Sequence, residues 1–339
     1  MQISDPTDST DPTVSTARRR ALRLLGAAPA VAAFGGFASQ TVRAADAALS
    51  SVTLVLGDQA GGTRALAEAA KVLEGTPYAF KWANFQGAAP LFEAQRAGAV
   101  DLAPAGDLPV LAAATGDPTL KIVATRVGSG AQLGILVPAD STLRSVAELK
   151  GRTVFVSSAR GSISQFQLYG ALAEAGLSRD DVPVRFVLPV DAFAAFESGR
   201  IDVWATFDPY FGTAVQRGAR VLRDGTGINS GLGFVTASGA AAADPLKRLA
   251  IADVLQRFQR AGEWAVANPD AYAHVYASLT RLPFDAAKTI TARSALKQRF
   301  IADSDIVALQ TVADSAFRDA ILPRRIDVRA IADTHIAKA

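Results

Sequence analysis

The sequence IDVWATFDPY, at residues 201–210, repeats a pattern that the chain carries about a hundred residues earlier. In the first copy Asp101 and Asp107 stand six residues apart, and in the second copy Asp202 and Asp208 do the same. In both copies a short helical segment ending in Gly precedes the first Asp, and Pro follows the second Asp within two positions. Such an echo predicts two lobes of similar build.

Short apolar runs alternate with helical patterns around each copy, which is typical of βαβ units built on a mostly parallel sheet. After residue 237 the pattern becomes almost wholly helical, so this tail must cover a lobe that other residues build. We therefore expect an α/β protein with two doubly wound, mostly parallel sheets, a hinge and a ligand cleft. The expected boundaries are 45–133 plus 238–339 for lobe 1, 134–237 for lobe 2, and 133–136 and 234–237 for the hinge.

Residues 1–44 have the pattern of an export signal. Three arginines at 18–20 precede an apolar, small-residue run at 24–37, and the last three residues before position 45 resemble a cleavage site. Paired arginines favour the twin-arginine pathway, while Ala21 in place of the usual Phe leaves the Sec pathway open. The run is too short and too rich in Gly and Ala to favour a retained membrane anchor. We expect cleavage near Ala44.

The composition excludes several kinds of function. The expected leader holds five of the 35 Lys and Arg and three of the 32 Asp and Glu, which leaves a mature net charge of +1. No basic field remains that would favour nucleic acid. The chain has no Cys, which excludes disulfides, thiolate metal sites and a Cys nucleophile.

Ligands of open α/β sheets bind beyond the carboxyl ends of the strands, where the amides of the following helices point outward. This rule selects loops at 57–63, 86–90 and 158–164, and the region of Asp208. Their Gly, Ser and Gln residues suit a small, anionic, oxygen-rich group. The ligand-binding residues that we predict are Gln59, Gln86, Gly87, Gly106, Arg160, Gly161, Ser162, Ser164, Phe207 and Asp208.

The loop at Gly161 to Ser164 is the strongest single candidate for binding an anion. Ser162 can cap the helix that follows, while Ser164 and unpaired amides remain available and Arg160 is close by. The alternative is an ordinary helix cap beside a solvated arginine.

The two aspartates of the opening stretch do not suit general acid–base catalysis. An extended run between Asp202 and Asp208 would hold them well over about 15 Å apart, too far to act on one bond. An Asp close before a first-turn Pro favours a helix cap, so we interpret Asp107 and Asp208 as caps. Side chains alternate along a strand, so about half of the aromatic residues from Trp204 to Phe211 should be core and the rest should face the cleft.

Metal and nucleophile motifs are missing from the sequence. His274 and His335 belong to no His-x-x-x-His or His-x-Glu pattern, and Gly161-Ser-Ile-Ser lacks the closing Gly of a nucleophile elbow. We expect no metal, no cofactor and no enzymatic activity.

Five segments resemble the substrate-binding proteins of aliphatic-sulfonate ABC importers, within the nitrate, sulfonate and taurine binding group, and the likeness runs from about Val52 to Arg329. The region from Asp202 to Thr226 carries the strongest resemblance. The segments are Gly106-Asp-Leu-Pro109, Glu148-Leu-Lys-Gly151, Arg160-Gly-Ser-Ile-Ser164, the stretch at 201–210, and Arg220-Val-Leu-Arg-Asp-Gly-Thr226.

The resemblance implies a type II periplasmic binding protein fold and a periplasmic monomer that delivers a small anionic organosulfur ligand to an ABC permease and its ATPase. It also implies that the loop at 161–164 takes the sulfonate oxygens and that Asp208 lies at the cleft. Taurine, a sulfate ester, nitrate or a thiamine precursor are alternative ligands on this scaffold. An exported desulfinase-like enzyme, which the missing Cys argues against, and a ligand-sensing module are the alternative functions.

Overall fold

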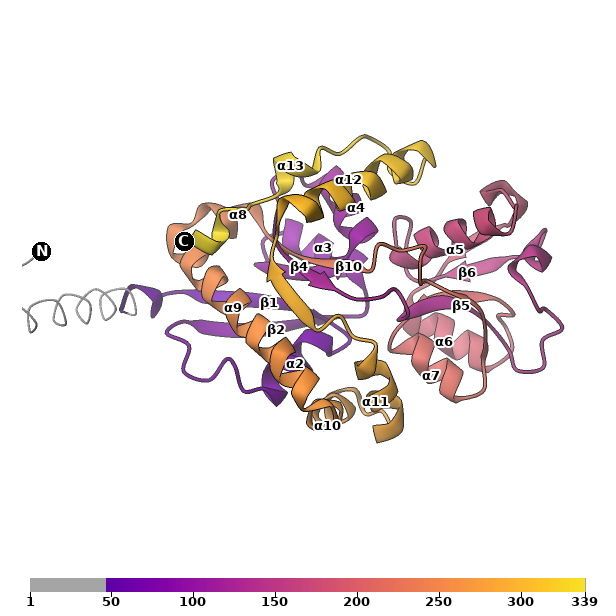
Figure 1. The fold of residues 1–339 in the computed structure, drawn as a ribbon, viewed down its shortest axis with the longest axis horizontal. Helices are drawn as coiled ribbons and strands as arrows, with labels where there is room; N and C mark the ends of the chain where they lie inside the picture. The colour runs from indigo at the N-terminus through magenta and orange to yellow at the C-terminus, as the bar shows by residue number, and fades with distance from the viewer. Residues whose placement is uncertain (1–46, 339) are drawn as a thin grey trace, which may run out of the picture. The chain divides into compact units, whose positions relative to one another are not determined.

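The computed structural model describes residues 47–338, so the expected export signal and its cleavage point lie outside the described residues. No helix in the described range has both the length and the apolar character that a membrane span requires. Two sheets with their own helices are seen in Figure 1.

The first sheet has the strand order β11-β4-β10-β3-β1-β2 and contains β1 (Thr53–Gln59), β2 (Ala79–Phe85), β3 (Leu102–Gly106), β4 (Lys121–Val127), β10 (Leu232–Ala237) and β11 (Lys297–Phe300). The strand β1 pairs in parallel with β2 and β3, while β10 is antiparallel to both β3 and β4, and β11 is antiparallel to β4. The strands β1 to β4 therefore run one way, and β10 and β11 run the other way.

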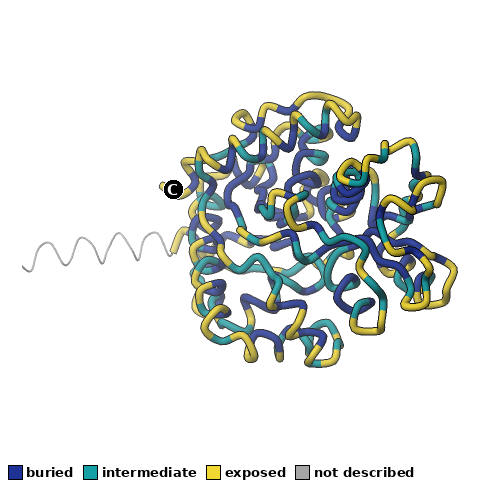
Figure 2. The backbone as a smooth tube through the Cα atoms, turned by 45° about the vertical axis from the view of Figure 1, so that its right-hand side comes forward, coloured by how far each residue is buried: buried dark blue, intermediate teal, exposed yellow. Residues whose placement is uncertain are grey.

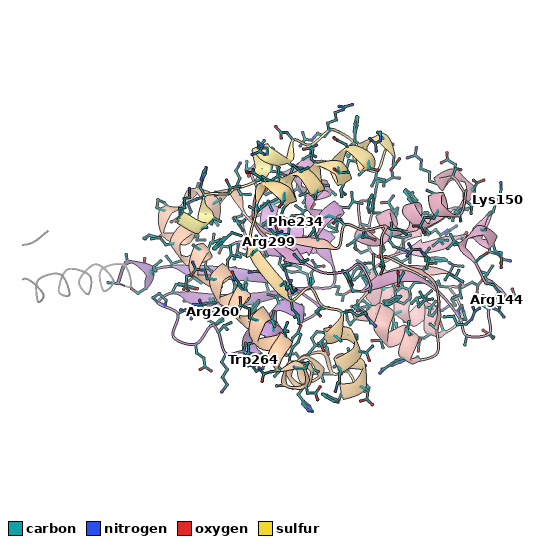
Figure 3. The ribbon with its side chains drawn as sticks, in the orientation of Figure 1. Arg144, Lys150, Phe234, Arg260, Trp264 and Arg299 are labelled. Atoms are coloured by element: carbon teal, nitrogen blue, oxygen red, sulfur yellow. The ribbon has the colours of Figure 1, made fainter. Side chains whose placement is uncertain are left out.

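Helices cover both faces of this sheet. One core cluster joins it to α3 (Ala88–Arg96), α4 (Asp107–Gly116) and α12 (Asp303–Arg318), and a second joins it to α9 (Pro245–Ala267). Neighbouring strand residues alternate between the two clusters, as Phe234 and Val235 do in β10. Figure 3 shows Phe234 inside this lobe, and Figure 2 shows the buried sheets and the exposed outer loops.

The remaining helices of the first lobe lie around this arrangement. α2 (Gly62–Ala69), α10 (Pro269–Thr280) and α11 (Phe284–Ala292) form a further cluster with the end of α9. The short elements are α8 (Gly239–Ala243), α13 (Val328–Ile331) and the 3-10 helix η3 (Ile336–Lys338). The tail after residue 237 packs against the first sheet and also supplies its edge strand β11.

The second sheet has the order β7-β6-β8-β5-β9 and contains β5 (Leu133–Val137), β6 (Val154–Val156), β7 (Val184–Phe186), β8 (Trp204–Phe207) and β9 (Arg220–Asp224). Only β5 runs against the other four strands. Its helices are α5 (Ile163–Glu174), α6 (Pro189–Glu197) and α7 (Tyr210–Gln216), with 3-10 turns η1 (Val146–Leu149) and η2 (Arg179–Asp181). The predicted fold, an α/β protein with two mostly parallel sheets, is confirmed.

The predicted hinge segments are wrong. Residues 133–136 belong to β5 inside the second sheet, and 234–237 belong to β10, which pairs on both edges inside the first sheet. The chain crosses between the sheets at 128–132 and 225–231, where the Gly128 amide donates to the Gly231 carbonyl at 2.7 Å. The sequence could not assign β10 to a lobe, because apolar strands look alike in both. Since β10 pairs inside the first sheet, the second lobe ends at the crossing at 225–231 rather than at residue 237.

Candidate functional site

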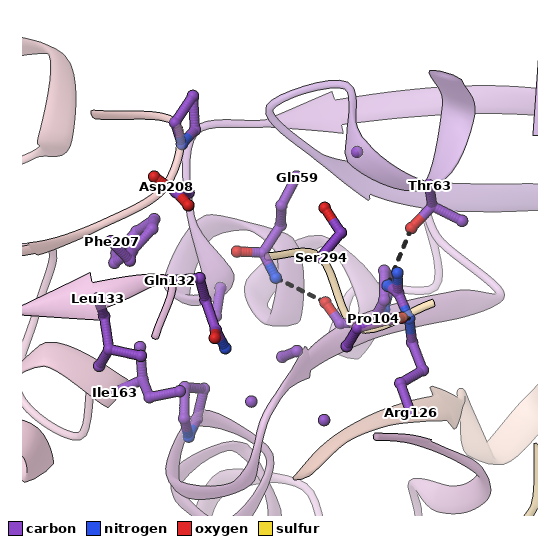
Figure 4. A pocket seen from close by; sticks show the side chains of 18 of the residues that line it. Gln59, Thr63, Pro104, Arg126, Gln132, Leu133, Ile163, Phe207, Asp208 and Ser294 are labelled. Carbon is purple, nitrogen blue, oxygen red and sulfur yellow. Dashed lines mark hydrogen bonds between the residues drawn. The ribbon is translucent and has the colours of Figure 1, made fainter. Parts of the chain in front are cut away.

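A cavity of about 240 Å³ lies between the two sheets, where the carboxyl ends of their strands meet. Gln59 ends β1, Gly106 ends β3 and Phe207 ends β8, and all three line it. Figure 4 shows residues of the second lobe, including Leu133 and Phe207, across this space from Thr63 and Arg126. Both lobes therefore supply walls of the cavity.

Arg126, near the end of β4, is the one cationic side chain among the described residues that line this cavity. Its guanidinium donates to the Thr63 hydroxyl and to the Ala295 carbonyl, each at 3.3 Å. Burial lowers the pKa of Arg126, while the charges of Tyr272 and Asp58 oppose that change. An arginine stays protonated in proteins, so it offers the cavity a positive charge and several N–H donors.

The loop after β1 is held in place by Asp58. The carboxylate of this fully buried residue accepts the Thr63 amide at 2.8 Å and the Arg64 amide at 3.4 Å, and so caps α2. Burial raises the pKa of Asp58, whereas these amides and Arg126 lower it. The same loop places Gln59, whose side-chain amide donates to the Pro104 carbonyl at 2.6 Å.

The loop before α5 closes another wall of the cavity. Ser162 is the N-cap of α5, and its hydroxyl accepts the Gln165 amide at 3.3 Å. The Gly161 amide donates to the Gln165 side chain at 2.7 Å. Ser162 lines the cavity together with Ser158, which belongs to the predicted loop 158–164 but was not among the predicted ligand-binding residues.

Asp208 lines the cavity just after β8 and forms an ion pair with Arg293, which directly follows α11. The guanidinium donates to both carboxylate oxygens at 2.9–3.1 Å, and the Gly212 amide donates to one of them at 2.8 Å. Burial raises the pKa of Asp208 to about 6, although Arg293 and Gly212 act to lower it. The pair leaves this wall of the cavity with little net charge.

The aspartates of the echo differ in part from the predicted caps. The N-cap residues are Gly106 for α4 and Pro209 for α7, so neither Asp107 nor Asp208 is the capping residue itself. Each carboxylate still accepts an amide of the adjacent helix, since Leu108 donates to Asp107 at 2.7 Å. Helix α4 begins one residue earlier than the Pro pattern predicts, at Asp107, and α7 begins one residue later, at Tyr210. The N-cap is therefore the neighbour of each Asp.

The stretch at 201–210 divides between core and cavity. Trp204 is fully buried in the second lobe and Phe207 lines the cavity, as alternation along a strand predicts. Asp202 is exposed before the start of β8, whereas Asp208 follows its end, so the two carboxylates do not form a pair.

The ten predicted ligand-binding residues fall into three groups. Those that line the cavity are Gln59, Gly106, Ser162, Phe207 and Asp208. Arg160 and Gly161 line a second, adjoining cavity. The remaining three line neither cavity: Gln86 is exposed, Gly87 packs beside Ser158, and Ser164 is fully buried.

Sequence reasoning missed several residues that line the cavity. Arg126 had a usable signal, because it stands near the end of an apolar strand and the carboxyl-end rule applies to β4 as well. The other missed residues had no local signal, since the crossing at 128–132 and the helical tail supply them: Gln132, Tyr276, Ile290 and Ser294.

A ligand-sized cavity between two lobes is a typical site for a small molecule and is the arrangement expected of a solute-binding protein. A family model described as "ABC transporter, phosphonate, periplasmic substrate-binding protein" matches residues 66–223. A candidate aliphatic sulfonates-binding protein of Escherichia coli (strain K12) is 32% identical over 88% of this chain and 93% of its own. Its counterpart in Bacillus subtilis (strain 168) is 30% identical over 76% and 78%.

Solved structures agree with these relatives. The alkanesulfonate-binding protein SsuA from Xanthomonas axonopodis pv. citri, bound to MOPS, has a TM-score of 0.76 and 29% identity over 83% of this chain and 98% of its own. The chain therefore belongs to the family of ABC-transporter periplasmic substrate-binding proteins that includes the aliphatic sulfonates-binding proteins.

The family consists of binding proteins rather than enzymes. A solved desulfurization enzyme shares 17% identity with this chain at a TM-score of 0.56, a likeness that shows the fold alone.

Proposed function

We propose that this protein is the exported solute-binding component of an ABC importer and that it binds an aliphatic sulfonate by closure of its two lobes. The observation that carries the proposal is the cavity between the sheets, in which one guanidinium faces neutral donors and apolar walls. Membership of the family and the names of the relatives support the sulfonate as the ligand class.

The anionic head would bind beside Arg126. A guanidinium carries five N–H donors in a fixed fork, and the two protein contacts of Arg126 are both long, at 3.3 Å. The hydroxyls of Thr63 and Ser294 also line this region of the cavity and add neutral donors. Three sulfonate oxygens would thus meet donors without a second full positive charge.

The aliphatic part of the ligand would contact the second lobe. Leu133, Ile163 and Phe207 line the cavity and present apolar surface. Burial of each methylene group stabilises a complex by about 0.8 kcal/mol. A ligand that touches both lobes binds the closed arrangement more tightly than the open one, so binding favours closure.

The importer role adds expectations about location and partners. The mature chain would begin after Ala44, act in the periplasm as a monomer, and deliver its ligand to a permease and an ATPase of the inner membrane. Taurine, alkyl sulfates, nitrate, thiamine precursors and, because of the matched family model, phosphonates are the competing ligands.

Calorimetric titration of the mature chain with butanesulfonate and with each competing ligand tests the proposal. We expect butanesulfonate to bind best, and Arg126→Met to weaken its binding at least 100-fold because the head loses its cation. Arg160→Met is the matched control, since Arg160 is exposed and lines the second cavity instead. A full loss with Arg160→Met and none with Arg126→Met would contradict this placement, and absence of sulfonate binding would contradict the function.

A further inference from the structure

A second cavity of about 180 Å³ adjoins the main one. The two cavities share the lining residues Ala88, Pro109, Ser158 and Ser162. In Figure 4 Ile163, the neighbour of Ser162, lies across the main cavity from Arg126. A ligand whose head is at Arg126 therefore has the second cavity on its opposite side.

Small side chains set the width of this second cavity. Ala89 from α3, Ala112 from α4 and Gly161 from the loop before α5 all line it. Gly161 has a φ of +81°, and a Cβ at this position would lie 2.8 Å from the Cβ of Ala112. Neither a larger side chain nor an ordinary backbone conformation fits there, so Gly keeps the space between α4 and the loop open.

Ser158 gives an independent indication of a ligand. Ser158 is 9% exposed and lines both cavities. Its hydroxyl has no hydrogen-bond partner within residues 47–338. The hydroxyl is not one of the fully buried side-chain atoms that lack a partner, so it is accessible from the cavities. The hydroxyl is next to Gly87, where an added Cβ would lie 3.3 Å from it. A donor thus stands free at the junction of the cavities.

We propose that the second cavity is a tail subsite, so that the protein takes sulfonates with long, substituted tails. The inference rests on the proposed function, with the head at Arg126. The tail would pass Ser158, which donates a hydrogen bond to an ether or hydroxyl oxygen of the tail, and continue between α3, α4 and the loop before α5. Glu93 and Arg160 are exposed at this cavity, so the far end of the tail would reach solvent.

Chain length provides the first test. Calorimetric titration of the mature chain would compare ethanesulfonate, hexanesulfonate and decanesulfonate. We expect the affinity to rise about fourfold for each methylene that becomes buried, continuing beyond hexanesulfonate. An affinity that stops rising at hexanesulfonate would overturn the tail subsite while leaving the proposed function in place.

Blocking variants provide the second test. Ala89 is exposed and lines only the second cavity, so Ala89→Leu combined with Ala112→Leu fills this cavity. We expect at least a tenfold loss of affinity for decanesulfonate and less than a twofold change for ethanesulfonate. Ala97→Leu is the control, because Ala97 is exposed at the end of the same helix α3. Equal affinity of the blocked and control variants for decanesulfonate would overturn the proposal.

Ser158→Ala provides the third test, with decanesulfonate and an analogue in which an ether oxygen replaces one middle methylene. We expect the variant to lose at least fivefold in affinity for the ether analogue and less than twofold for decanesulfonate. An equal loss for every ligand, including ethanesulfonate, would place the head at Ser158 and overturn the inference. Failure of wild-type protein to bind even ethanesulfonate would instead refute the proposed function.

Discussion

Arg293 of the first lobe and Asp208 of the second form a bidentate ion pair at the edge of the ligand cavity. The Arg293 guanidinium also lies 5.4 Å from the ring centroid of Phe211, so it packs against the second lobe by two kinds of contact. A second contact across the lobes runs from the Arg179 side chain to the Asp319 carbonyl. The Arg293 pair therefore links the two lobes, as the proposed closure requires, and it neutralises a carboxylate that would otherwise repel an anion.

Removal of Arg293 should weaken ligand binding mainly by destabilising the closed form. Arg293→Met leaves Asp208 buried without its cation, which costs about 2–5 kcal/mol in comparable pairs. We expect about 30- to 100-fold lower affinity for butanesulfonate, seen as faster dissociation in stopped-flow measurements. Adding Asp208→Asn should restore part of the affinity, because the unpaired charge is gone.

A matched control for this experiment is Arg329→Met. Arg329 forms an ion pair with Asp303 on the protein surface, where 65% and 77% of the two side chains are exposed. Such a surface pair contributes little to stability. The role of the ion pair in closure would be contradicted if Arg293→Met left the dissociation rate of butanesulfonate unchanged. It would also be contradicted if the double variant bound butanesulfonate more weakly than Arg293→Met alone.

The pH dependence of stability should carry the signature of Asp208. Its pKa is raised from 3.8 to about 6 in the fold, so between these values the folded chain binds a proton that the unfolded chain does not. The contribution of Asp208 to stability is therefore present below about pH 4 and is lost as the pH rises through 6, by about 3 kcal/mol in all. Urea titrations of wild type and Asp208→Asn at pH 4 to 7 should show this difference.

Asp305 provides a comparison of opposite sign. Burial acts to raise its pKa, but hydrogen bonds from Arg299, Ala302 and Thr125 lower it overall. Its stabilising contribution is present above pH 4 and is lost at lower pH. If wild type instead loses stability relative to Asp208→Asn as the pH falls, then the pKa of Asp208 is lowered in the fold. That result would show that Arg293 outweighs burial at Asp208.

The sequence predicted the architecture because its main signals are local. The echo of Asp-x5-Asp and the alternation of apolar runs with helical patterns are properties of short segments, and both lobes follow them. The hinge was misplaced because β5 and β10 are both apolar strands, and only their pairing shows which sheet each one joins.

The candidate site could be predicted only in part. Loops that directly follow strands, such as those with Gln59, Ser162 and Phe207, obey a rule that sequence can apply. Arg293 does not, because it is 85 residues from Asp208 and the folded chain alone brings them together. Arg126 also stands near the end of a strand, so the same rule could have selected it, but its position against Thr63 appears only in the structure.

Gly262 should be the most sensitive glycine of the first lobe. A Cβ at this position would lie 1.9 Å from the backbone oxygen of Leu296. The helix α9 and the backbone at Leu296 therefore approach each other too closely for any side chain at residue 262. Backbone cannot rotate away, and we expect Gly262→Ala to lower the free energy of unfolding by about 3 kcal/mol or more. Gly116→Ala, with nothing within 4 Å of the added atom, is the control and should change it by less than about 1 kcal/mol. Equal urea midpoints for the two variants would contradict this packing.

Gly212→Ala should separate closure from folding, because the atoms it meets come largely from the opposite lobe. An added Cβ would lie 2.5 Å from Nη2 of Arg293, 2.7 Å from Cγ1 of Ile290 and 2.8 Å from Oδ1 of Asp208. With the lobes apart, only the contact with Asp208, which is in the same lobe as Gly212, would remain. Alanine favours the helix by about 0.5–1 kcal/mol, so we expect the unliganded protein to keep most of its stability. The closed form must displace Arg293, so we expect at least a tenfold loss of affinity for butanesulfonate in calorimetry. A variant that binds like wild type would show that α7 and α11 do not meet in the liganded protein, whereas a large fall in the urea midpoint would assign Gly212 to folding instead.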